Sequence, residues 1–448
     1  MAMTTYTLTC LSPVHIGTGG QFSKFDGAYQ DRQWYVIDLD RVLAHQAGAT
    51  DLARAMNDRN FAWGVWLREQ RIAPSDAAAY TLSCPQDPEE VPIREAIKDA
   101  YGYPYFPGTS IKGAVRTVIL WSLTRAETLR PTLAEQYLTL CLHARDLFTK
   151  IEERRAFDQA AMHREILTQT LGLREDEARS YQQTLYRVLN IREERLREPR
   201  EWRNFQQRLG RLGRSREWLG QPVERAVLGR DPNHDLMRAV QVSDTPPGRI
   251  ERLAIGIVWT YTLRGNRLVE KREQDGEYKT LVEWLMPETT LRLDIRLDEF
   301  LFTDAANRDL QFRGPKEQTV RQLARTCNDY ARTIITAEKA FYTIYGPGAM
   351  QDFYRDLETT LNDLPASAFL LNIGWGGGWE VKTIGDLLQT ALGEDGFRQL
   401  RQRYRLGVAP QTNRLDPNTP FPKTRRIAYD GGSPRWSMGW VKVEPQES

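Results

Sequence analysis

The segment from residue 105 to residue 116 reads YFPGTSIKGAVR and combines a Pro-Gly turn with a helix start and two spaced cations. A helix that begins at Thr109 or Ser110 leaves backbone N–H groups unpaired at the positive end of the helix dipole. Lys112 and Arg116 are four residues apart, so both lie on one face of that helix. This arrangement can bind a phosphate, although an ordinary capped helix with solvated cations would contain the same residues.

Two glycine-rich loops could also contact a phosphate backbone. Residues 11–20 read LSPVHIGTGG, and residues 371–383 read LNIGWGGGWEVKT. Glycine has no Cβ, so an RNA backbone can come close to its main chain. Glycine also adopts the positive φ that turns several N–H groups toward one anion. The tryptophans of the second loop, Trp375 and Trp379, could stack on bases or pack into the core.

These motifs occur in the order S-P-x-H-x-G, then P-G-(S/T)-S-I-K-G-x-x-R, then G-W-G-G-G. In that order they resemble the RAMP proteins of CRISPR systems. In detail the chain is similar to the fifth subunit family of the type III-A Csm complex, which caps the 3′ end of the guide RNA. Residues 236–246, 421–424 and 438–441 match that family too. The resemblance therefore covers roughly the whole chain.

The resemblance implies a non-catalytic, cofactor-free RNA-binding subunit of an antiviral ribonucleoprotein. It would hold the 3′ part of the guide RNA (crRNA), terminate the filament of backbone subunits and support crRNA maturation. The implied partners are crRNA, target RNA near its 5′ end, a Csm backbone RAMP subunit and a small helical subunit. Whether a host crRNA-trimming nuclease docks here stays open. The candidate RNA-binding residues are His15, Gly17, Lys112, Arg116, Gly374, Gly376, Gly377, Gly378, Lys382, Lys423 and Arg425.

Two residues keep a catalytic interpretation open. Some RAMP proteins cut RNA with histidine as general acid or base, and His15 is the only histidine inside a motif. Its position beside a proline and a glycine loop favours a ring that packs against the loop. Asp26 lies in a region where backbone RAMP subunits carry a cleaving aspartate, but its surroundings differ from theirs. The alternatives are therefore a RAMP endoribonuclease that uses His15 or Asp26, and a protein-only scaffold whose glycine loops shape interfaces.

The composition is typical of a globular protein with more than one core, with 448 residues, 41% hydrophobic and 27% charged. The net charge is only +2, so nucleic-acid binding depends on where the cations lie. No apolar run approaches the ~20 residues of a membrane span, and the first residues lack the pattern of a secretory signal. The four cysteines are isolated, and no carboxylates have metal-ligand spacing. We expect a cytoplasmic protein with reduced thiols and no metal site.

Helices and strands are both expected. Apolar alternation predicts strands at residues 4–10, 34–38, 253–263 and 289–300, and the helical period predicts helices at 41–71, 110–124 and 319–345. From about 130 to 220 charged, Leu-bearing segments predict helices throughout. Periodicity alone gives an α+β fold; with the resemblance it becomes two ferredoxin-like (RRM-like) RAMP domains with a large helical insert. We predict an N-terminal domain at 1–128, the insert at 129–222 and a C-terminal domain at 223–448.

Overall fold

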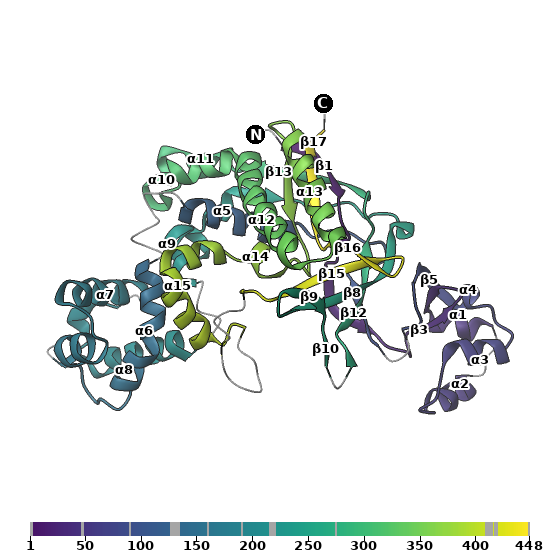
Figure 1. Cartoon of the computed structure of the whole chain (residues 1–448), viewed down its shortest axis with the longest axis horizontal. Coiled ribbons are helices and arrows are strands. Elements are labelled where there is room, and N and C mark those ends of the chain that lie inside the picture. Colours follow the sequence, from purple (N-terminus) through teal and green to yellow (C-terminus); the bar gives the residue numbers. More distant parts are fainter. Residues whose placement is uncertain are drawn as a thin grey trace.

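The computed structural model describes residues 3–45, 49–88, 91–125, 135–158, 161–189, 191–214, 221–273, 276–407, 415 and 420–446. These residues form a sheet of five strands, a sheet of ten strands and a two-stranded ribbon, with helices packed around them (Figure 1). The predicted α+β class is confirmed.

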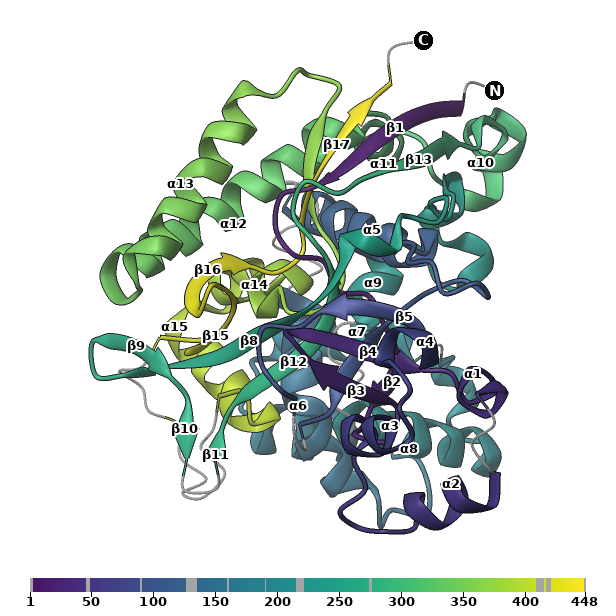
Figure 2. The same ribbon diagram turned by 90° about the vertical axis from the view of Figure 1, so that its right-hand side faces the viewer.

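The two ends of the chain meet in the five-stranded sheet. Its strands, in sheet order, are β14 (Phe369–Asn372), β17 (Trp440–Pro445), β1 (Met3–Cys10), β13 (Thr290–Leu297) and β7 (Val240–Val242). All neighbours in this sheet are antiparallel. Figure 2 shows β1 and β17 side by side, with the two chain ends beyond them. The alternation in β1 is that of a half-buried strand, because Leu8 and Cys10 are fully buried.

Two helices give this sheet a ferredoxin-like organisation. α5 (Gly108–Arg125) packs against β7, α12 (Leu323–Tyr345) packs against β14, and the two helices contact each other. Along the chain the elements follow the order β1, α5, β7, β13, α12 and β17, which is the strand–helix–strand–strand–helix–strand order of a ferredoxin-like unit. Helix α12 is shorter than predicted, because Gln322, with φ −95° and ψ 37°, separates it from α11 (Pro315–Arg321).

The ten-stranded sheet is built around the long strand β8 (Leu253–Arg264). Its main path is β2 (Gly17–Phe22), β6 (Ile93–Ala96), β12 (Lys279–Leu285), β8, β5 (Ala78–Ser83), β4 (Gln33–Ile37) and β3 (Gly27–Gln30). β15 (Thr424–Asp430) and β9 (Arg267–Glu270) also pair with β8, and β16 (Ser433–Ser437) pairs with β15. Strand β8 therefore joins segments that are far apart in the sequence.

The first predicted helix, at residues 41–71, is divided into three helices. They are α1 (Leu39–Ala44), α2 (Ala49–Met56) and α3 (Trp63–Glu69), followed by the short α4 (Pro74–Ala77). A turn at Asp58, whose carboxylate accepts the N–H of Asn60 at 2.9 Å, separates α2 from α3. Figure 1 shows these helices with β3 and β5 as a lobe at the right of the molecule.

Helices also make up the region predicted as an insert. They include α6 (Glu135–Ile151), α7 (Glu175–Val188), α8 (Pro199–Arg214) and α9 (Gln221–Val227), and α15 (Gly385–Tyr404) packs against α6. Between residues 135 and 214 the described part of the chain contains no strand. The remaining α-helices of the described residues are α10 (Asp304–Leu310), α13 (Gly348–Asp363) and α14 (Gly378–Lys382). None of the described helices is long and apolar enough to cross a membrane.

The strands do not divide at the boundaries predicted near residues 128 and 223. β1 pairs with β13 and β17, and β6 pairs with β12, so each large sheet contains strands from both the N-terminal and the C-terminal segment. An interior strand needs a hydrogen-bonded neighbour on each side. Both neighbours of β1 and one of the two neighbours of β6 come from the C-terminal segment. The two sheets are therefore interleaved in sequence, which differs from the predicted contiguous domains.

Candidate nucleic-acid interface

The glycine loop of residues 374–378 connects β14 to α14 and contacts the N-terminal motif. Gly374, Gly376 and Gly378 have φ values of +71°, +98° and +82°, which L side chains rarely adopt. The N–H of Trp375 donates to the backbone oxygen of His15 at 2.8 Å, and a Cβ on Gly374 would collide with the same carbonyl. The two glycine motifs, far apart in the sequence, thus form one structure.

Gly377 differs from its neighbours. Its φ is −64°, so it does not need the left-handed conformation. A Cβ there would collide with Val381 and would lie 2.5 Å from Oδ1 of Asn372. Glycine is required at this position because protein atoms surround it. Gly378, by contrast, has no atom within 4 Å of an added Cβ, so its main chain is the part of the loop that an incoming molecule can approach.

The loop borders a cavity of about 440 Å³ that also touches α12 and β15. Its charged lining residues are Lys382, Arg425, Arg426, Glu338 and Glu380. Three cations and two carboxylates therefore face or border one space. Their availability to a phosphate depends on what each already binds.

Lys382 donates from Nζ to the backbone oxygen of Asn372 at 3.2 Å. Desolvation lowers the pKa of Lys382 to about 8, so it is charged at neutral pH and loses its charge in mild alkali. Burial, followed by the negative charge of Glu338, raises the pKa of Glu380 to about 7. The charges of both groups therefore change between about pH 7 and pH 8.

The side chain of Arg425 is bonded to other groups in the protein interior. Its guanidinium forms an ion pair with Glu338 at 2.7 Å, and the two side chains are 11% and 5% exposed. The guanidinium carbon also lies 4.0 Å from the centroid of the Phe341 ring. This pair fixes β15 to α12, which differs from the predicted phosphate contact. Lys423, just before β15, is half-buried and its backbone oxygen accepts the N–H of Leu263.

Two arginines outside the predicted set of RNA-binding residues contact the loop instead. The guanidinium carbon of Arg426 lies 4.6 Å from the centroid of the Trp375 ring, and that of Arg94 lies 4.8 Å from the same centroid. Trp375 is half-buried and packs on an apolar patch of the second sheet that includes Val258 and Val282. Nothing in the local sequence distinguishes Arg426 from Arg425; only the fold separates their roles.

His15 is a buried, hydrogen-bonded ring. It is 2% exposed, its Nδ1 lies 2.6 Å from the backbone oxygen of Glu283, and it makes an edge contact with Trp375. A Cβ on Gly17 would lie 2.8 Å from its Nε2. Burial, and less strongly the charges of Arg94 and Lys98, lower the pKa of His15. This geometry agrees with the expectation that the ring packs against the loop.

A fully buried carboxylate, that of Glu283, lies in the core next to His15. Glu283 in β12 is 0% exposed, and it accepts from Nζ of Lys98 at 2.6 Å and from the N–H of Ala96 at 2.7 Å. The hydroxyl of Tyr80 lies 3.3 Å from its other oxygen. None of the side chains in this cluster is among the residues predicted from the sequence. A signal was present, because Glu283 is a lone acid in an apolar strand, between Val282 and Trp284.

Asp26 lies apart from the cavity. It is exposed in the turn before β3, and its carboxylate accepts from the N–H and hydroxyl of Ser23 at 2.6 and 2.7 Å. β3 ends the path of the second sheet, beyond β5 and β4 from the central β8. Asp26 and His15 are therefore held by different parts of the fold. Within the described residues, no group of three His, Cys, Asp or Glu side chains could hold a metal ion.

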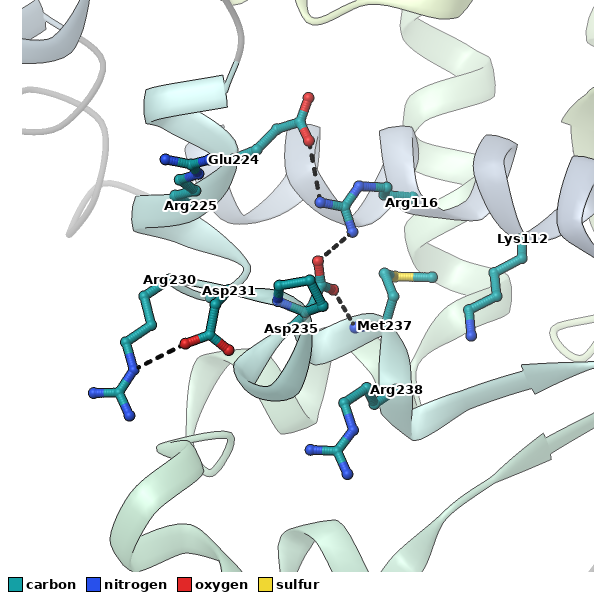
Figure 3. A pocket seen from close by; sticks show the side chains of 11 residues that line it. Lys112, Arg116, Glu224, Arg225, Arg230, Asp231, Asp235, Met237 and Arg238 are labelled. Carbon is teal, nitrogen blue, oxygen red and sulfur yellow. Dashed lines mark hydrogen bonds and ion pairs between the residues drawn. The ribbon is translucent and has the colours of Figure 1, made fainter. Parts of the chain in front are cut away.

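Lys112 and Arg116 line a second cavity, of about 480 Å³, on α5 (Figure 3). Arg116 bonds Asp235 at 2.6 Å and Glu224 at 3.1 Å. In Figure 3 the side chain of Lys112 lies apart from these ion pairs. Lys112 is half-buried, and desolvation lowers its pKa, opposed by the charge of Asp235.

Other parts of the protein occupy the N-terminus of α5. The N–H of Gly108 donates to Oδ1 of Asp244 at 2.7 Å, and a Cβ on Gly108 would collide with the carbonyl of Val242. This differs from the expected helix start with free N–H groups. The structure thus brings His15, Gly17, residues 374–378, Lys382 and Arg425 into one region and places Lys112 and Arg116 in another.

Comparisons with known proteins agree with the motifs. The sequence model of the RAMP superfamily matches residues 7–382. A Streptococcus thermophilus protein described as CRISPR system Cms protein Csm5 is 28% identical over 131 residues, which cover 25% of this chain. That match spans only 37% of the length of the relative.

Two solved structures share the fold along nearly the whole chain. One chain in a cryo-EM structure of a type III-A Csm–crRNA–target RNA ternary complex has a TM-score of 0.59 at 22% identity, with 98% of this chain and 100% of that chain covered. The crystal structure of T. onnurineus Csm5 has a TM-score of 0.56 at 23% identity, with 97% and 99% covered. The similarity to the fifth Csm family is confirmed, and because the family match covers most of its residues, the chain belongs to the RAMP superfamily.

Proposed function

We propose that this chain is a subunit of a type III-A Csm effector complex and that it binds crRNA. RAMP membership and the sequence similarity to a Csm5 protein support the assignment. The fold is shared with a chain of a complex that contains crRNA and target RNA. The observation that carries the RNA-binding role is the cavity beside the glycine loop.

The cavity has the features that a phosphate backbone requires. Gly378 exposes a main chain without a Cβ and has a positive φ, the kind of backbone conformation from which anion-binding N–H groups are built. Lys382 and Arg426 line the same space and add positive charge. Phosphate contacts of this kind give affinity without selecting a sequence, as expected for a subunit that accepts many guides.

The finer role that we propose is that of a cap. The subunit would bind the 3′ portion of the crRNA, terminate the filament of backbone RAMP subunits and support crRNA maturation. Target RNA near its 5′ end and the small helical subunit would lie next to it. A host trimming nuclease would act on the crRNA end that this subunit leaves exposed.

We infer that the subunit does not cut RNA. A general acid or base must reach the proton that it transfers. The ring of His15 is buried and bonded to the backbone of Glu283, and the carboxylate of Asp26 is bonded to Ser23 in a turn away from the cavity. Neither residue is placed to act on a phosphate at the glycine loop.

One experiment separates the three functions. The purified chain is incubated with a 5′-labelled crRNA from its own operon, with and without Mg²⁺, and run on native and denaturing gels. A shift without cleavage supports the proposal. Cuts that disappear in His15→Ala or Asp26→Ala favour the endoribonuclease, and neither shift nor cuts favours the protein-only scaffold. Crosslinking in the assembled complex then tests whether the chain contacts the crRNA 3′ end.

A further inference from the structure

Trp375 lies between two arginines that come from separate strands. Arg94 belongs to β6 and Arg426 to β15, and in the sheet β12 and β8 lie between these two strands. Both guanidinium carbons are within 5 Å of the indole centroid, so they are less than 10 Å from each other. The indole is therefore a spacer that holds two like charges at a short, defined separation.

Among the residues that the structure describes, no acidic side chain neutralises either charge. No carboxylate of the described residues forms a hydrogen bond or ion pair with Arg94 or Arg426. Glu95, the neighbour of Arg94, instead approaches Lys98 at 3.6 Å and Thr18 at 3.1 Å. Arg425, by contrast, forms an ion pair with the buried carboxylate of Glu338. Desolvation and then the charge of Arg94 lower the pKa of Arg426, as expected for cations that lack an anion.

We propose that Arg94 and Arg426, held against Trp375, clamp the phosphodiester backbone of single-stranded RNA where it crosses the glycine loop. The inference rests on the proposed function and assigns its phosphate contacts to residues outside the three motifs. Guanidinium groups suit this role because their planar N–H pairs bind phosphate oxygens bidentately while their faces stack on an aromatic ring. Arg426 and Trp375 line the cavity beside Gly378, so this side of the clamp and the exposed main chain border the same space.

The clamp also assigns a role to Trp375. Both guanidinium groups lie over the indole, and the ring of His15 packs against it at an interplanar angle of 87°. Trp375 therefore positions the arginines, and bases do not stack on it. RNA affinity at this point depends on backbone charge and is insensitive to base identity.

Binding of a fluorescein-labelled crRNA, measured by anisotropy over a range of salt, tests the clamp in the full-length chain. Arg94→Gln and Arg426→Gln should each weaken binding about tenfold, the range of a charge-assisted hydrogen bond. Each should flatten the slope of log K against log salt by about 0.7. Arg355→Gln is the matched control, since it removes one equally charged side chain from α13, where Arg355 pairs with Asp352. It should leave affinity and slope at the wild-type values.

Variants of the ring and of the RNA distinguish positioning from base stacking. Trp375→Phe keeps an aromatic spacer and should bind within about threefold of wild type, whereas Trp375→Leu should lose as much as an arginine variant. Within a scan of the crRNA, a single uncharged methylphosphonate linkage should weaken binding at one position. Removing bases one at a time should have no effect there. A base whose removal weakens binding, with the loss abolished in Trp375→Leu, would overturn the clamp in favour of stacking.

The outcomes separate this inference from the function on which it rests. If the wild-type chain does not bind crRNA, both fail. If it binds, and Arg94→Gln and Arg426→Gln match Arg355→Gln in affinity and salt slope, the clamp is refuted while the RNA-binding function stands. Thermal melting of every variant must first show a folded protein. Arg426→Lys gives an additional check, because it should restore the salt slope without restoring full affinity.

Discussion

The buried pair of Lys98 and Glu283 allows a sharp test of how the glycine loops are supported. In Lys98→Met the ammonium is replaced by an apolar side chain of similar length, and the carboxylate of Glu283 remains at 0% exposure. It keeps the N–H of Ala96 and the hydroxyl of Tyr80 as donors but loses its ion pair at 2.6 Å. An uncompensated charge is then left in the core.

Removing one partner of a buried ion pair costs about 3–5 kcal/mol. The cost should depend on pH. Burial already raises the pKa of Glu283 although Lys98 opposes it, so without Lys98 that pKa rises further. A carboxyl with a raised native pKa loses stability as pH rises from its unfolded pKa through its folded pKa. The penalty of Lys98→Met is therefore largest near pH 8 and shrinks toward pH 5, where Glu283 can be protonated.

Urea unfolding at pH 5, 6.5 and 8, followed by tryptophan fluorescence, measures this effect. The double variant Lys98→Met/Glu283→Gln should recover most of the lost stability at pH 8, because the neutral amide can still accept from Ala96. A loss below about 1 kcal/mol for Lys98→Met at pH 8, or a loss that is the same at pH 5, would refute the reasoning. So would a double variant no more stable than the single one.

Three further results are expected. Gly378→Ala should cost about 1 kcal/mol in urea unfolding because its φ is +82°, whereas Gly377→Val should cost more and lower the melting temperature clearly, since it meets packed atoms. RNA affinity should fall from pH 6 to pH 9, because Glu380 becomes charged near pH 7 and Lys382 becomes neutral near pH 8. In an anisotropy titration, Glu380→Gln should remove the decrease near pH 7 and keep the decrease near pH 8. Arg425→Met should cost about 3 kcal/mol of stability yet leave the salt slope of RNA binding unchanged; a flatter slope in a folded variant would contradict the structural role.

Local sequence determined much of the architecture. The strand at residues 3–10 and the helix at 108–125 follow from apolar periods of two and about 3.6 residues. Gly374 and Gly376 could be expected at positive φ because a run of glycines is typical of such a loop. The ordered motifs indicated the superfamily. Positions where other atoms come close to the main chain accept few residue types, so such a motif can be recognised within a short segment.

Strand pairing and charge availability were decided by the tertiary structure. β1 lies between strands that begin about 290 and 440 residues into the chain, and no local period encodes which strands pair. Arg425 and Arg426 are adjacent and chemically identical, yet Arg425 meets Glu338, 87 residues away in sequence. Arg426 meets an indole and, within the described part of the chain, no acid. A cation is most available to a phosphate where the fold leaves it without a carboxylate partner. That depends on long-range contacts, which are not visible in the residues on either side of it.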